Sequence, residues 1–173
     1  MVPVLRFIGL LNAAVWLGAI VFFTAVVGPT FFTPEVKALV TVPRAGMIAQ
    51  LVIERYLVLQ EWCSGIALVH LLAEWLYFNR LNSKASLWIL LFCLGASLLS
   101  ERTLVPKMKE LHLIKYAMQT TPDQKKAAER SFAILHGTSS VTNLLMLAGV
   151  LFYYWRLSNG NQGGKSSAGA RFR

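Results

Sequence analysis

The sequence predicts an all-α protein, a bundle of four transmembrane helices, and three observations lead to this prediction. The chain has 173 residues, of which 55% are hydrophobic and 14% are charged, whereas a typical soluble domain carries about a quarter charged residues. A helix needs about 20 mostly apolar residues to cross the hydrocarbon core of a bilayer. Four apolar runs of this kind occupy most of the chain, so little room is left for a second domain.

The four runs give the expected limits of the spans. They cover residues 5–28, 54–78, 87–104 and 135–157, and residues 158–173 are expected to form a flexible basic tail. Pro29 is expected to end the first span, because the residue before a proline is pushed out of the helical region. Residues 29–53 are too apolar for a solvated linker, and they predict a short interfacial or partly re-entrant helix.

The segment between the last two spans predicts helices that extend beyond the membrane around the third loop. It mixes charged and apolar residues from Pro106 to Arg130. Within it, Thr121-Pro122-Asp123-Gln124 is a helix-start signal with proline at the first helical position. We therefore expect the third helix to continue past the bilayer, to turn near Thr120, and to be followed by a return helix that leads into the fourth span.

The formal net charge of +9 raises the question of an anionic partner. The basic residues are scattered among the segments that flank the spans, and they form no single patch with interleaved aromatic residues, so nucleic acid is not an expected partner. The expected partner is the lipid bilayer, including its anionic headgroups. Ten basic residues flank the larger loops and seven lie on the other side, which slightly favours cytoplasmic larger loops. We expect the plasma or inner membrane as the location.

Polar residues inside the spans predict a functional cluster. His136, Ser140 and Asn143 recur at spacings of four and three, so a helix places them in one stripe. Glu54 and Glu61 of the second span are close to two helical turns apart. Helices that run in the same direction would bring these residues to matching depths. The expected cluster consists of Glu54, Glu61, Glu101, His136, Ser140 and Asn143.

Two interpretations of this cluster remain open at this stage. Polar and ionisable residues within a membrane often bind a cation, relay protons or hold a polar substrate. The alternative is that they only form hydrogen bonds between helices, with Arg55 and Arg102 as counter-charges, at about 0.6 kcal/mol for each pair.

A metal or haem site is a further hypothesis. His70 and His136 differ in depth by about 24 Å at 1.5 Å per residue, which argues against a haem bound by both. Histidine, methionine, cysteine and carboxylate side chains can bind transition metals, but the spacings are not specific, and no cofactor is predicted. The two candidate sets are His112 with His136 and Met108, and Cys63 with His70 and Glu74.

Motifs of soluble enzymes are missing from the sequence. It contains no Gly-x-Ser-x-Gly, no phosphate-binding loop, no His-Glu-x-x-His and no Cys-x-x-Cys. The two cysteines, Cys63 and Cys93, lie inside expected spans, where they are expected to be small buried apolar residues. An enzymatic function is therefore not predicted.

One segment resembles a known family. Phe132-x-x-Leu-His-Gly-x-Ser-x-x-x-Asn-Leu144 is similar to the transmembrane-protein-205-like family of small four-span proteins, most of them of unknown function. The segments 18–23 and 27–32, Gly-Ala-Ile-Val-Phe-Phe and Val-Gly-Pro-Thr-Phe-Phe, resemble the first span of that family and the turn after it. The resemblance implies a four-helix membrane bundle and no particular reaction.

These observations predict a non-enzymatic four-span membrane protein. Its polar cluster either handles a cation or a small polar solute or holds the bundle together. The competing hypothesis is an accessory subunit that packs against a larger membrane complex, with faces of small residues and aromatic runs as contacts. A homo-oligomer is a separate possible partner state and would count against this alternative. A metal- or haem-binding redox protein is less favoured.

Overall fold

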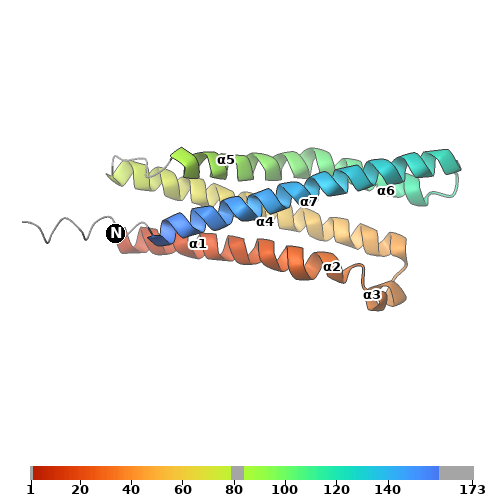
Figure 1. Cartoon of the computed structure of the whole chain (residues 1–173), viewed down its shortest axis with the longest axis horizontal. Helices are drawn as coiled ribbons and strands as arrows, with labels where there is room; N and C mark the ends of the chain where they lie inside the picture. The colour runs from red at the N-terminus through yellow and green to blue at the C-terminus, as the bar shows by residue number, and fades with distance from the viewer. Residues whose placement is uncertain (1, 79–83, 160–173) are drawn as a thin grey trace, which may run out of the picture.

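The computed structural model describes residues 2–78 and 84–159, and every regular element in this part of the chain is helical (Figure 1). Four helical segments are long and apolar enough to cross a membrane. They are Pro3–Thr30, Val42–Tyr77, Lys84–Tyr116 and Pro122–Asn159. The predicted all-α bundle of four membrane-crossing helices is therefore confirmed, and the protein is an integral membrane protein.

Each of the first and third crossing segments combines several elements into one continuous helix. In chain order the elements are α1 (Val2–Phe22), the π-helical turn η1 (Phe23–Val27), α2 (Gly28–Thr30), α3 (Pro34–Leu39), α4 (Val42–Phe78), α5 (Lys84–Leu99), the π-helical turn η2 (Ser100–Leu104), α6 (Val105–Tyr116) and α7 (Pro122–Asn159).

The long helices surround one interior in the order α1, α4, α5 and α7, and α7 closes the ring by packing against α1 (Figure 1). One end of the bundle, here called the loop end, carries α3 and the turn between α6 and α7. The 37 residues of α4 span about 55 Å, whereas the hydrocarbon core is about 30 Å thick. This helix is therefore long enough to project beyond the membrane.

The start of α7, near the third loop, confirms the predicted helix-start signal at Thr121. The Thr121 backbone N–H donates to the Gln124 Oε1 at 3.0 Å, and the Gln124 N–H donates to the Thr121 Oγ1 at 3.3 Å. This reciprocal pair is a capping box, which satisfies two N–H groups at the start of α7. At the other end of α7, Arg6 donates to the carbonyl oxygens of Leu157 and Ser158 at 3.4 and 3.0 Å.

The structure differs from the sequence prediction between the first two spans. Only α3 forms a separate short helix there, and α4 already begins at Val42, which extends the second helix by three turns toward the loop end. At the far end of the chain, α7 includes Ser158 and Asn159, and the rest of the expected tail, residues 160–173, lies outside the described residues.

The first helix ends at Thr30, one residue after the proline that was predicted to end it. Pro29 lies inside α2, directly after η1, and Pro106 occupies the same place after η2. A proline inside a helix lacks the N–H donor and clashes with the carbonyl four residues earlier. Each π-helical turn places one extra residue in the ring, as the bond from the Gly28 N–H to the Phe23 oxygen shows. This wider turn accommodates the proline inside the helix.

The bundle interior combines large and small side chains. Trp16, Ile20 and Leu90 are fully buried, and Ser64 and Ser97 are fully buried beside them. Small residues allow membrane helices to approach closely. Aromatic side chains are exposed at the end opposite the loop end, in the last turns of α4 and α7 and the first turns of α5, as expected for a belt at the headgroups. They are Trp75, Tyr77, Trp88 and Trp155.

Two histidines dock onto glycines of neighbouring helices in the same way. The ring of His70 lies against Gly9 of α1, and its Nε2 donates to the Leu5 carbonyl oxygen at 2.9 Å. The ring of His112 lies against Gly46 of α4, and its Nε2 donates to the carbonyl oxygen of Pro43, also at 2.9 Å. A glycine is required at both contacts, because any side chain there would overlap the imidazole ring.

We expect the substitution Gly9→Ala to lower the free energy of unfolding by about 1–3 kcal/mol, the usual cost of overpacking, because a Cβ at Gly9 would overlap the ring of His70. The matched control is Gly18→Ala on the same helix, where a Cβ would meet nothing within 4 Å. Unfolding of both variants in mixed detergent micelles, followed by circular dichroism, checks this. Equal stability of the two variants would contradict the docking contact.

Candidate functional site

The inward face of α4 carries the polar residues that meet the other helices. Tyr56, Gln60, Ser64 and Ala67 recur at spacings of three and four, and all four are buried. This is the periodicity of one helix face. Glu54 and Glu61 lie off this stripe, so the four stripe residues at this level are uncharged.

A chain of hydrogen bonds joins α4, α7 and η1. The Tyr56 hydroxyl donates to the Asn143 Oδ1 at 2.5 Å, and the Asn143 Nδ2 donates to the Thr24 Oγ1 at 2.8 Å. The Thr24 hydroxyl donates in turn to the Ile20 carbonyl oxygen at 2.7 Å. The Tyr56 ring stacks on Phe23, with centroids 3.9 Å apart. The Tyr56–Asn143–Thr24 chain therefore holds three helices together by side chains.

Further hydrogen bonds continue from this chain along the contact between α1 and α4. The indole Nε1 of Trp16 donates to the Gln60 Oε1, and both residues are almost completely buried. The Asn12 Nδ2 donates to the Cys63 carbonyl oxygen at 2.9 Å. A bilayer offers no water to satisfy such groups, so they pair with one another across helices. These bonds fix the register of α1 against α4.

A cavity of about 390 Å³ lies beside the Tyr56–Asn143–Thr24 chain. Residues of α2, α4, α6 and α7 line it, and both π-helical turns contribute, through Phe23 and Thr24 of η1 and Ser100 and Leu104 of η2. None of its lining residues is Asp, Glu, Lys or Arg. The polar lining residues are Thr24, Tyr56, Ser100, His136, Ser139, Ser140, Thr142 and Asn143. We call this space the interhelical cavity.

Residues 11–117 match the family model described as a domain of unknown function (DUF4149). The chain belongs to this family. The matched segment begins within α1 and ends just after α6, so it contains Thr24 and Tyr56 of the polar chain and leaves Asn143 outside. No curated protein and no solved structure matches the chain.

The resemblance to the transmembrane-protein-205-like family is wrong. The family that matches is DUF4149, and nothing links the chain to the other family. The Leu-His-Gly and Asn-Leu element on which that resemblance depended lies in α7, outside the matched residues. Because the matched family is uncharacterised, a function has to be argued from the site itself.

The structure divides the predicted polar cluster into three parts. His136, Ser140 and Asn143 all line the interhelical cavity, and the Ser140 hydroxyl donates to the His136 carbonyl oxygen at 2.9 Å. Glu54 is paired instead with Lys109 of α6. None of the three predicted glutamates lines the cavity. The α7 half of the cluster is therefore brought together, and the carboxylates lie elsewhere.

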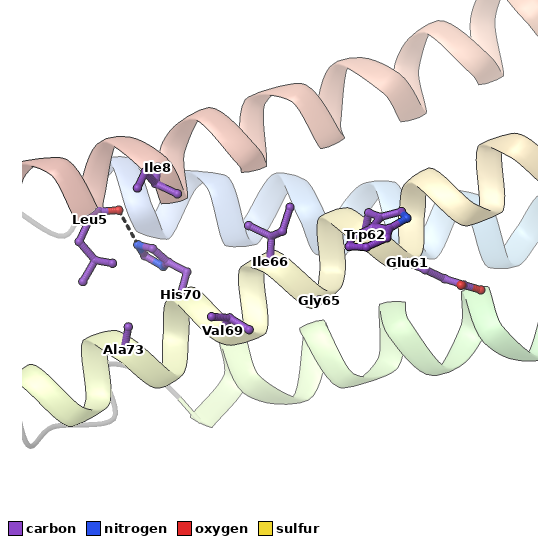
Figure 2. Close-up of a pocket in the computed structure, with 9 residues that line it drawn as sticks. All are labelled: Leu5, Ile8, Glu61, Trp62, Gly65, Ile66, Val69, His70 and Ala73. Atoms are coloured by element: carbon purple, nitrogen blue, oxygen red, sulfur yellow. Dashed lines mark hydrogen bonds between the residues drawn. The ribbon is translucent and has the colours of Figure 1, made fainter.

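Glu61 and Glu101 form the third part. Glu61 lies close enough to Glu101 and Arg102 to interact electrostatically with both. Figure 2 shows its carboxylate directed from α4 toward the helix formed by α5 and η2. Asn143 of α7 bonds to Tyr56 and not to Glu61. Counting residues had placed Asn143 at the depth of Glu61, so the predicted depth was wrong by more than one helical turn.

Sequence reasoning missed Tyr56 and Gln60. The signal that could have found them is the spacing of Tyr56, Gln60 and Ser64 at four-residue intervals, which places them on one face. Glu54, Glu61 and Ser64 form a competing stripe with more conspicuous charges. Burying an uncharged hydroxyl or amide costs less than burying a carboxylate, and this difference selects the first stripe for the interior.

The described residues bring together no three His, Cys, Asp or Glu side chains that could hold a metal ion. The ring centroids of His112 and His136 lie 6.3 and 6.2 Å from that of Phe132. His70 Nε2 lies 4.0 Å from Glu74 Oε1 and is bonded to a backbone carbonyl. Neither candidate metal set gains support from this geometry.

A second hollow, of about 700 Å³, lies between α1 and α4 (Figure 2). Leu5 and Ile8 of α1 face Ile66 and Val69 of α4 across it. Its walls are almost entirely apolar and lie within the crossing segments, so hydrocarbon chains of the surrounding lipid suit it. Glu61 and His70 also line it, but it offers no group of hydroxyl and amide side chains comparable to that of the interhelical cavity.

We expect a double-mutant cycle to measure the Tyr56–Asn143 bond. Tyr56→Phe keeps the ring on Phe23 and should lower the free energy of unfolding by about 0.6 kcal/mol, the average for such bonds in membranes. Asn143→Leu removes two interhelical bonds and should cost about 1–2 kcal/mol. Because the two single variants share one bond, the double variant should cost less than the sum of both. Strictly additive effects would mean that the two side chains do not interact.

Proposed function

We propose that this membrane protein binds a small neutral polar solute in the interhelical cavity. The observation that carries the proposal is the lining, in which hydroxyl, amide and imidazole side chains converge among apolar ones and no charged residue takes part. The volume of about 390 Å³ lies in the range of about 300–1,000 Å³ that ligand pockets occupy.

The absence of carboxylates from this lining favours a neutral solute over a cation. A cation that leaves water for a membrane interior needs a negative partner, because desolvation of an unpaired charge costs several kcal/mol. Glu54 is already paired with Lys109, and Glu61 and Glu101 lie with Arg102 away from the cavity. Hydroxyl and amide groups suit a solute that offers both donors and acceptors.

The two π-helical turns add support to the proposal. Such turns are rare and often occur at functional sites. Here both of them border the same cavity, although they belong to different helices and lie 73 residues apart, from Val27 to Ser100. A purely structural role for both prolines would not require their turns to meet around one space.

The competing hypothesis of an accessory subunit depends on the exposed apolar surface of the helices. Lipid covers such a surface equally well, since it occurs on every membrane bundle. The same holds for a homo-oligomer. The cavity distinguishes the two classes of function, because a protein that only packs against a partner needs no polar space inside its own bundle.

We expect a short-chain alcohol that carries a diazirine to label the cavity when the full-length protein is irradiated in lipid nanodiscs. Mass spectrometry should locate the label on cavity residues such as Tyr56 and Asn143. Ser139→Phe, which fills the cavity, should reduce this labelling several-fold. Thr138→Phe is the matched control, because Thr138 does not line the cavity and its hydroxyl bonds to its own helix.

A quaternary ammonium probe with the same diazirine separates the neutral solute from a cation. The proposal expects little labelling of the cavity by this probe. Labelling by the cationic probe alone, or equal labelling of both phenylalanine variants by the alcohol, would overturn the proposal.

The substitution Glu61→Gln tests the carboxylates directly. We expect it to leave labelling by the short-chain alcohol unchanged, because Glu61 does not line the cavity. The free energy of unfolding should stay the same or rise slightly, since one of two neighbouring like charges is removed. Loss of labelling in a normally folded variant would instead support a role in cation or proton handling. Glu101→Gln is the matched control.

A further inference from the structure

The lining of the interhelical cavity is buried on one side and exposed on the other. Leu57 of α4 and Val105 and Met108 of α6 are at most 8% exposed. Phe32 after α2 and Leu144 of α7 are 61% and 53% exposed. The cavity therefore has a closed floor on α4 and α6 and an open rim, which runs between α7 and the helix formed by α1, η1 and α2.

The surface around this rim belongs to the membrane. Val141 and Leu145 flank Leu144 on α7, and all three are exposed. Pro29, which lines the cavity on the opposite side of the rim, is exposed as well. These residues lie within the crossing segments, where hydrocarbon, not water, covers exposed apolar side chains. The opening of the cavity is thus directed sideways, into the bilayer.

Polar side chains lie along α7 beside this apolar rim, in a series that runs from the charged start of the helix toward the cavity. The exposed Arg130 marks the aqueous part of α7, and the exposed His136 follows six residues later, which is about 9 Å along the helix. Ser140 is exposed one turn further, and Asn143 lies about 10 Å beyond His136. Polar groups thus lead from headgroup depth to the Tyr56–Asn143–Thr24 chain along the edge of the opening.

We infer that the cavity admits its occupant sideways from the bilayer, between α2 and α7 and beside the Asn143–Thr24 bond, and that this occupant is a neutral single-chain amphiphile with a hydroxyl or amide head. The inference rests on the proposed function and names the class of solute. The head bonds to the uncharged polar groups of the cavity, and the apolar chain passes over Leu144 into the surrounding lipid. A charged lipid headgroup finds no counter-charge in the lining.

The test uses two diazirine alcohols of different chain length on the full-length protein in nanodiscs. One is the short water-soluble alcohol, and the other carries a long alkyl chain with the diazirine next to the hydroxyl. We expect the long-chain alcohol to label Tyr56 and Asn143 more strongly than the short-chain alcohol does at the same total concentration. Leu144→Trp should reduce this labelling several-fold, because the indole narrows the opening.

Leu145→Trp is the matched control. Leu145 is exposed like Leu144, at 56% against 53%, but does not line the cavity, so its substitution should leave labelling unchanged. Both variants place one tryptophan on the lipid-facing surface, and thermal unfolding checks that both are folded. Labelling by the short-chain alcohol that is stronger and insensitive to Leu144→Trp would overturn the sideways entry and leave the proposed solute binding intact. Labelling of the cavity by neither alcohol would overturn both.

Discussion

The architecture of this bundle depends on two prolines that lie inside membrane-crossing helices. Pro29 and Pro106 each lack an N–H donor and lie inside a helix, and in each case a π-helical turn ends two residues before the proline and accommodates the clash. The two turns bring Thr24 and Ser100 to the same interior space. The interhelical cavity therefore lies where two helices depart from α geometry.

Hydrogen bonds between uncharged side chains hold the helices together around that space. Tyr56, Asn143 and Thr24 link three helices at the cavity, and Trp16 with Gln60 continues the contact toward the middle of the bundle. Each bond is worth only a fraction of a kcal/mol in a membrane, because the separated helices also find partners. Their main effect is on register, since a shift of one residue would leave several buried groups unsatisfied.

Much of the fold was predictable because its signals are local. The apolar runs gave the four crossing helices, and the Thr121–Gln124 signal gave the start of α7. The α7 half of the site, His136, Ser140 and Asn143, also followed from spacing alone. The half contributed by α4 did not, because Glu54 and Glu61 compete with Tyr56 and Gln60 for the interior, and only the packing of helices decides between two stripes. At Pro29 the local rule placed the helix end one residue too early, because the proline lies inside the last turn, which follows a π-helical turn.

The side-chain amide of Asn143 provides the most direct measurement of the Tyr56–Asn143–Thr24 chain. In full-length protein with ¹⁵N-labelled asparagine, the account predicts that Tyr56→Phe shifts the amide signals of Asn143. The signals of Asn12, which donates to the Cys63 carbonyl oxygen, should keep their positions. Asn143 signals that exchange rapidly with water in the wild-type protein, and that do not respond to Tyr56→Phe, would contradict a hydrogen-bonded chain at the cavity.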